Sequence, residues 1–158
     1  MTAPNFEIKV VEREAYHTVG MKVRTTMVQA AIDAPKLWEN DFGPRMPEIQ
    51  GFPTFSFGAS VMADEEHFDY WATMPLPAGA PVPAGMEILD LPAGLYAECQ
   101  VPSLNELAAA YMFIYQDWLP GSGYDYTAFN AASYELYPAD FMQTGHLSLY
   151  MPIRRKSG

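Results

Sequence analysis

The segment WLPGSGYDYTAFNAASYELYP, residues 118–138, decides how the chain is interpreted. It is predicted to end a helix, cross a loop rich in Gly, Pro and Tyr, and enter a short strand. Because side chains alternate between the two faces of a strand, Ser133, Glu135 and Tyr137 should share one face. The other face then carries the apolar residues Ala132, Tyr134 and Leu136. The first face is too polar for a core and too aromatic for a wet surface, so we predict that it floors a ligand pocket with Glu135 as its charge.

Length and composition predict one globular domain over residues 1–158, with 49% hydrophobic and 18% charged residues. No apolar run approaches the ~20 residues of a membrane span, and the first ten residues lack the basic and apolar regions of a signal peptide. We therefore expect a cytoplasmic protein that does not associate with membranes. The single Cys99 can form neither an internal disulfide nor a thiolate metal site, and no cofactor is expected.

The charge of the chain is −10, and its distribution is uneven. Between Pro81 and Ile153 there are eight acidic residues and no Lys or Arg. Direct binding to nucleic acid is not expected, because phosphates need a basic surface. A carboxylate buried in this half has no cation nearby in the sequence. A cationic or neutral ligand therefore fits the chain better than an anion.

The order strand, strand, helix, strand, strand is predicted twice. The first set consists of strands at 6–13 and 16–26, a helix from the capping pattern at 26–29 that Pro35 interrupts, and a hairpin at 55–63 and 67–76. The second set consists of strands at 86–91 and 94–101, a helix from the capping box at 103–106, and strands at 130–137 and 147–153. The RRKSG tail at residues 154–158 is expected to fray.

The two sets are in register, since the same 80-residue offset separates Glu7 from Glu87, Tyr16 from Tyr96 and Trp38 from Trp118. We therefore predict an α+β fold made of two β-β-α-β-β repeats, residues 6–76 and 86–153, related by a pseudo-twofold axis. Both should contribute to one antiparallel sheet with the helices on one face. A groove for a ligand should lie between the halves.

Four segments in this order carry a resemblance to a known family: LWENDFGPRMPEI, YQDWLPGSGY, SYELYP and LSLYMPIRR. Together they resemble the GyrI-like (gyrase-inhibitor-like) small-molecule-binding domains. These are related to the effector-binding domains of AraC-type and multidrug-responsive bacterial transcription activators. The resemblance implies a pocket between the two halves for hydrophobic, often cationic, aromatic compounds. It also implies an acidic pocket residue on the strand matched by SYELYP, which is Glu135.

Two other functions stay open at this point. Some standalone GyrI-like members resemble hydrolases of cyclopropane-bearing alkylating toxins, which would make Glu135 catalytic. Alternatively, the acidic surface could meet a protein partner such as DNA gyrase or a regulator. A helix-turn-helix segment is not expected within residues 6–153, so a relative of the regulators would here be the sensing part.

Glu135 is the main candidate residue, and the alternative for it is a solvated glutamate at the edge of a strand. Alternation suggests further pocket walls, for each of which plain core packing is the alternative: Tyr137, Tyr96, Tyr150 and one of Tyr70 and Trp71, which lie on opposite faces. Trp118 could close one end of the pocket or belong to the core, and Glu98 could be a second carboxylate. No metal site is predicted, because the three histidines are scattered and the Asp64–His67 segment fits a solvated turn.

Overall fold

The structure, a computed structural model, describes residues 6–49, 55–126 and 132–156. The first half contains β1 (Ile8–Arg13), β2 (Tyr16–Thr25), α1 (Ala30–Lys36), the π-helical η1 (Leu37–Phe42), the 3-10 helix η2 (Gly43–Glu48), β3 (Ser56–Met62) and β4 (Phe68–Pro75). The second half contains β5 (Glu87–Leu91), β6 (Gly94–Val101), η3 (Leu104–Glu106), α2 (Leu107–Phe113), η4 (Ile114–Trp118), η5 (Leu119–Gly121), β7 (Tyr124–Tyr126), β8 (Ser133–Tyr137), α3 (Phe141–Thr144) and β9 (Leu147–Arg155). The duplicated β-β-α-β-β order and the α+β class are confirmed.

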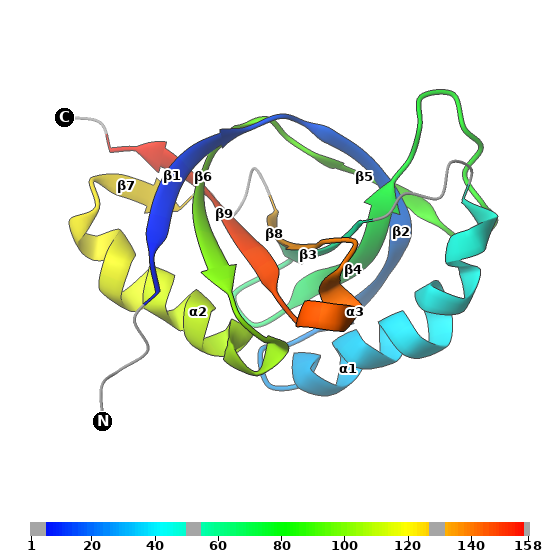
Figure 1. The fold of residues 1–158 in the computed structure, drawn as a ribbon, viewed down its shortest axis with the longest axis horizontal. Coiled ribbons are helices and arrows are strands. Elements are labelled where there is room, and N and C mark those ends of the chain that lie inside the picture. Colours follow the sequence, from blue (N-terminus) through cyan, green and yellow to red (C-terminus); the bar gives the residue numbers. More distant parts are fainter. Residues whose placement is uncertain (1–5, 50–54, 127–131, 157–158) are drawn as a thin grey trace.

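Within the described residues the strands form one antiparallel sheet in the order β1-β6-β9-β8-β3-β4-β2-β5, with β7 added beside β9. The two ends of this order are joined, because β1 continues into β2 and β5 continues into β6. One register therefore runs from the pair Ile8–Cys99 to the pair Gly20–Glu87. The sheet closes into a ring, which Figure 1 shows from its open side. The sequence did not predict this closure. Seven ladders link the eight strands of this order, and within the described residues only β1 and β5 among them pair on a single side.

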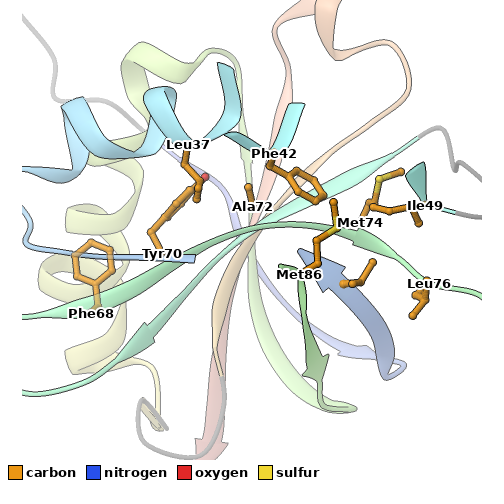
Figure 2. Close-up of a cluster of buried hydrophobic side chains, with 10 residues drawn as sticks. Leu37, Phe42, Ile49, Phe68, Tyr70, Ala72, Met74, Leu76 and Met86 are labelled. Atoms are coloured by element: carbon orange, nitrogen blue, oxygen red, sulfur yellow. The ribbon is translucent and has the colours of Figure 1, made fainter. Parts of the chain in front are cut away.

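Helices α1 and α2 lie outside the ring, as Figure 1 shows. In the first half α1 and η1 contact β2 and β4, and in the second half α2 contacts β6. Each helix covers one hydrophobic cluster of buried side chains. Figure 2 shows the cluster of the first half, which includes Leu37, Phe42, Tyr70 and Met74. The helices therefore share the outer face of the sheet, as predicted, and a third cluster fills the inside of the ring.

The helix of the first half differs from its prediction at Pro35, which lies inside α1 and does not end it. Proline has no N–H to donate, and the wider hydrogen-bond pattern of η1 begins two residues later, at Leu37. The start of the helix agrees better, since the Thr26 hydroxyl accepts a hydrogen bond from the Gln29 N–H at 3.1 Å. At the second predicted box the Ser103 hydroxyl instead donates to the Glu106 carboxylate at 3.4 Å.

The C-terminal tail was predicted to fray, and this is wrong for its first residues. Strand β9 extends to Arg155 because β7 pairs with it, with Asp125 opposite Arg154. Strand β7 and the short helix α3 were not predicted. Part of the expected strand at 130–137 lies outside the described residues, and β8 occupies 133–137. None of the helices in the described parts of the chain is long and apolar enough to cross a membrane.

Gly20 is the point of closest approach in the sheet. It lies in β2 between Thr73 of β4 and Glu87 of β5. A methyl group on its Cα would overlap the backbone carbonyl of Ala72, which cannot move without breaking the ladder. Glycine is therefore required at this position by the close approach of the neighbouring backbone.

We therefore predict that Gly20→Ala lowers the free energy of unfolding by about 3 kcal/mol or more, or prevents folding, because the overlap is with backbone atoms. Gly121→Ala is the matched control, since an added methyl group there meets no atom within 4 Å. It should change the stability by less than about 0.5 kcal/mol. Urea denaturation of both variants measures the difference, and equal stability of the two variants would contradict the closely packed ladder.

Candidate ligand-binding site

Glu135 lies at the centre of β8, paired with Gly58 of β3 on one side and Leu149 of β9 on the other. Its side chain points to the helix-covered face of the sheet and is only 2% exposed. The absence of a side chain at Gly58 makes room for it. A Cβ atom at position 58 would lie 2.9 Å from Glu135 Oε1 and would also overlap the Tyr70 hydroxyl. The glycine therefore allows a carboxylate and a phenol to meet on one face.

Tyrosine hydroxyls hold both oxygens of this carboxylate. Tyr111 of α2 donates to Oε2 at 2.6 Å, and Tyr137 of β8 donates to Oε1 at 3.1 Å. Trp38 of η1 donates its indole N–H to the Tyr70 hydroxyl at 2.9 Å and packs against the Tyr137 ring at 5.8 Å between centroids. These five residues, which we call the Glu135 cluster, come from both halves of the chain. The site therefore lies where the two helices and the sheet meet.

The electrostatics of Glu135 are unusual because its charge has no opposite partner. Burial raises the pKa of Glu135 to about 7, and the hydrogen bonds from Tyr111 and Tyr137 oppose this only in part. No Lys or Arg of the described residues contributes to the shift or forms an ion pair with Glu135. A carboxyl group in this setting is poised between its neutral and charged forms near neutral pH.

The tyrosines of the cluster stay protonated. Burial, followed by the charge of Glu135, raises the pKa of Tyr70, Tyr111 and Tyr137 far above the ordinary tyrosine value. Their hydroxyl groups can therefore act as hydrogen-bond donors at any pH that the protein experiences. The cluster can stabilise a negative charge at its centre and present aromatic rings around it.

Two of the aromatic residues proposed from the sequence belong to this cluster, Tyr137 and Tyr70. Of the pair Tyr70 and Trp71, it is Tyr70 that shares a face of the sheet with Glu135. The other candidates lie on the opposite face of the sheet, inside the ring: Trp71, Tyr96, Glu98 and Tyr150. The reason is the register. Tyr150 pairs with Tyr134 and not with Glu135, and Glu98 pairs with Tyr150.

Trp118 also stays outside the Glu135 cluster. It stacks on Tyr124 of β7 at 6.1 Å between centroids and packs against the hydrophobic cluster beneath α2. Of the two positions considered for Trp118, packing against the core therefore fits the structure. Glu98 is held by the Tyr150 hydroxyl at 2.9 Å and forms no pair with Glu135.

The sequence analysis missed Tyr111 and Trp38 as site residues. Tyr111 was not singled out within its predicted helix, and Trp38 was used only to establish the repeat. A signal was present for both, because a buried Tyr or Trp needs a partner for its polar hydrogen. Glu135 is the acceptor for the Tyr111 hydroxyl, and the Tyr70 hydroxyl accepts from Trp38.

A closed antiparallel sheet of two repeats, with a buried carboxylate among tyrosine hydroxyls under its helices, defines an effector-binding domain of the GyrI-like type. The comparisons agree. The chain belongs to the Cass2 family, described as integron-associated effector binding protein, whose profile matches residues 9–153. The resemblance inferred from the sequence is thereby confirmed.

Similar proteins of known identity include transcriptional regulators. The transcriptional regulator BrlR of Pseudomonas aeruginosa is 30% identical over 156 residues, which is 94% of this chain and 56% of BrlR. The chain thus spans little more than half the length of this relative. The C-terminal domain of EcmrR superimposes with a TM-score of 0.71 at 14% identity, over 96% of this chain and 99% of that domain. SAV2435 bound to tetraphenylphosphonium superimposes with a TM-score of 0.69 at 12% identity, over 94% of each chain.

The raised pKa of Glu135 predicts a pH dependence of stability. The folded protein holds the proton more tightly than the unfolded chain, so this contribution to stability is complete at low pH. It is lost as the pH rises from the ordinary carboxyl value through about 7, for a total of about 3 kcal/mol. Glu135→Gln keeps a neutral acceptor and lacks this titration. We expect the variant to gain stability relative to wild type between pH 5 and pH 8, measured by urea denaturation at both values.

The comparison between pH values cancels the contributions of all other acidic groups, which the two proteins share. Glu65→Gln is the matched control, because Glu65 lies in an exposed turn. It should follow wild type at both pH values. A Glu135→Gln variant that also follows wild type at both values would contradict the raised pKa.

Proposed function

We propose that this domain binds a hydrophobic cation at the Glu135 cluster, with Glu135 as the counter-ion. The observation that carries the proposal is a carboxylate 2% exposed, held by two tyrosine hydroxyls and without a basic partner among the described residues. An isolated buried charge is costly, and a ligand cation would remove that cost. The binding of tetraphenylphosphonium by SAV2435, which shares the fold, supports this ligand class.

The rings of the cluster suit such a ligand. Trp38 and Tyr137 lie nearly perpendicular to each other, and Phe141 of α3 packs against Tyr137 at 5.0 Å between centroids. A cation over the face of such a ring is attracted by about 0.5–2 kcal/mol. Two or three rings together with one carboxylate are sufficient for micromolar binding, about −8 kcal/mol. A lipophilic aromatic cation would use both parts of the site.

Binding would move the helices away from the sheet, because Glu135 is covered by Tyr111 of α2 and by Trp38 and Tyr70 of the first half. Tyr111 connects the carboxylate to α2 directly. A ligand that reaches Glu135 has to replace or share this hydrogen bond. The position of α2 would then report whether the site is occupied, which is what a sensing domain requires.

The biological role that follows is the sensing or sequestration of hydrophobic cationic compounds. Because the chain spans 56% of the regulator BrlR, a sensing role within a regulator is one form of this proposal. The hydrolase and gyrase-partner hypotheses stay predictions. Accumulation of a hydrolysed product with time, on incubation with a cyclopropane-bearing alkylator, would favour the first of them.

The test is calorimetric titration with tetraphenylphosphonium at pH 6 and pH 8. If the cation needs ionised Glu135, a pKa of about 7 makes about a tenth of the protein competent at pH 6 and about nine tenths at pH 8. The wild-type affinity should therefore rise by about tenfold between the two. Below pH 7 binding should also release a proton, so the measured heat should depend on the buffer.

Glu135→Gln should weaken the binding at pH 8 by at least tenfold and remove its pH dependence, because the counter-ion is lost. Glu65→Gln carries the same change of net charge in an exposed turn and should bind as wild type does. Unchanged affinity in Glu135→Gln, with the variant folded by circular dichroism, would show that the cation binds elsewhere.

A further inference from the structure

The inside of the ring contains a second group of aromatic side chains, on the face of the sheet opposite to Glu135. We call it the inner aromatic chamber, and it consists of Tyr16, Phe55, Phe57, Tyr96, Tyr134 and Tyr150. The rings are linked in a chain, from Tyr16 and Phe57 at 5.1 Å between centroids to Tyr134 and Tyr150 at 5.2 Å. This chamber is separate from the Glu135 cluster because neighbouring residues of β8, Tyr134 and Glu135, point to opposite faces.

One cation enters this chamber. Arg13 stands at the end of β1, where the chain bends into β2, and its Nε donates to the Tyr134 hydroxyl at 3.2 Å. The guanidinium carbon lies 4.1 Å from the centroid of the Tyr150 ring and 5.6 Å from that of Tyr16. The guanidinium therefore lies between tyrosine rings, which attract it through their faces.

Part of this guanidinium has no partner. The Nη2 atom of Arg13 is buried and has no hydrogen-bond acceptor among the described residues, the one side-chain atom of that kind in this part of the chain. Arg13 also takes part in none of the ion pairs of the described residues. A buried charged donor without an acceptor is costly, and such a group calls for an explanation. An anionic acceptor would satisfy it.

A second donor stands beside Nη2. The Tyr134 hydroxyl accepts the bond from Arg13, and no acceptor for its own proton is found among the described residues. The neighbouring hydroxyls are already committed, since Tyr96 donates to the Pro92 carbonyl and Tyr150 to Glu98. One N–H and one O–H, held together by the Arg13–Tyr134 bond, therefore remain for a ligand.

The chamber is only partly covered at this end. Arg13, Tyr16 and Phe55 are only partly buried, whereas Phe57, Tyr96 and Tyr134 have at most 1% of their surface exposed. The residue opposite Arg13 in the ladder is Gly94, and a side chain there would meet no atom within 4 Å. Position 94, the neighbour of Arg13 across the ladder, is therefore not covered by other described atoms.

From this arrangement we propose a second binding site in the domain, for a small aromatic carboxylate. The carboxylate accepts hydrogen bonds from Arg13 Nη2 and the Tyr134 hydroxyl, and its ring packs against Tyr16 and Tyr150. A net charge of −10 disfavours small inorganic anions, so the affinity has to combine the charge-assisted bonds with burial of a ring. This proposal is independent of the function of Glu135, which lies on the other face.

The test is calorimetric titration of the whole chain with benzoate and with its neutral analogue benzamide. We expect benzoate to bind wild type and Arg13→Gln to weaken that binding at least tenfold. Arg24→Gln is the matched control, because Arg24 is an exposed arginine paired with Asp69 at 2.8 Å. It should bind benzoate as wild type does, and benzamide should bind all three proteins at least tenfold more weakly than benzoate binds wild type.

Two further measurements separate this site from the Glu135 cluster and from a folding defect. In wild type, benzoate should shift the ¹⁵N resonance of Arg13 Nε and leave the affinity for tetraphenylphosphonium unchanged. Tyr134→Phe removes the second donor, keeps the ring, and should weaken benzoate binding as well. The proposal is overturned if wild type does not bind benzoate at millimolar concentration, if the Arg13 resonance does not move, or if Tyr134→Phe and Arg13→Gln both bind it as wild type does.

Discussion

The burial of one carboxylate without a cation is the constraint on which the site depends. Several features of the chain are arranged around Glu135. Gly58 leaves space beside it, Tyr111 and Tyr137 donate to it, and Leu149 covers its other flank in the ladder. Even so, the pKa stays raised to about 7, so the two hydrogen bonds do not offset the loss of water. The ionised form of Glu135 is thus disfavoured at the point where the two halves of the domain meet.

Closure of the sheet buries side chains on both of its faces. The outer face is covered by the helices, and the inner face is enclosed by the ring. In an open sheet with helices on one side, the face of Tyr134 would be exposed to water. In the ring the same face is enclosed, and Tyr134 has no exposed surface. Strand alternation then places two neighbouring residues of β8 on opposite faces, with Glu135 outside the ring and Tyr134, the hydrogen-bond partner of Arg13, inside it. The carboxylate of Glu135 and the guanidinium of Arg13 are therefore kept on opposite faces of the sheet.

Much of this could be predicted from the sequence because the signals are local. Alternation along SYELYP separates Glu135 from Tyr134, the 80-residue offset reveals the repeat, and Thr26 marks the start of a helix. The expectation that Tyr96, Glu98 and Tyr150 lie beside Glu135 differs from the structure, because it depends on the pairing of distant strands. The sequence shows that Tyr96 and Glu98 share a face of β6, but it does not contain the register that puts this face inside the ring. Ring closure itself arises from the shared register of β1–β2 with β5–β6, a long-range property that a single strand pattern does not encode.

The free-energy cost of ionising Glu135 also affects how the domain would respond to a ligand. Above pH 7 the buried Glu135 carries a charge that lowers stability, and the hydrogen bond from Tyr111 connects that charge to α2. A cation that neutralises Glu135 recovers the stability that ionisation removed, so its binding free energy includes a contribution from the protein as well as from direct contacts. A neutral compound of equal shape gains the contacts but not this contribution. Under the proposed function, selectivity for charge would follow from the burial of Glu135, while the aromatic rings would restrict the shape of the ligand less.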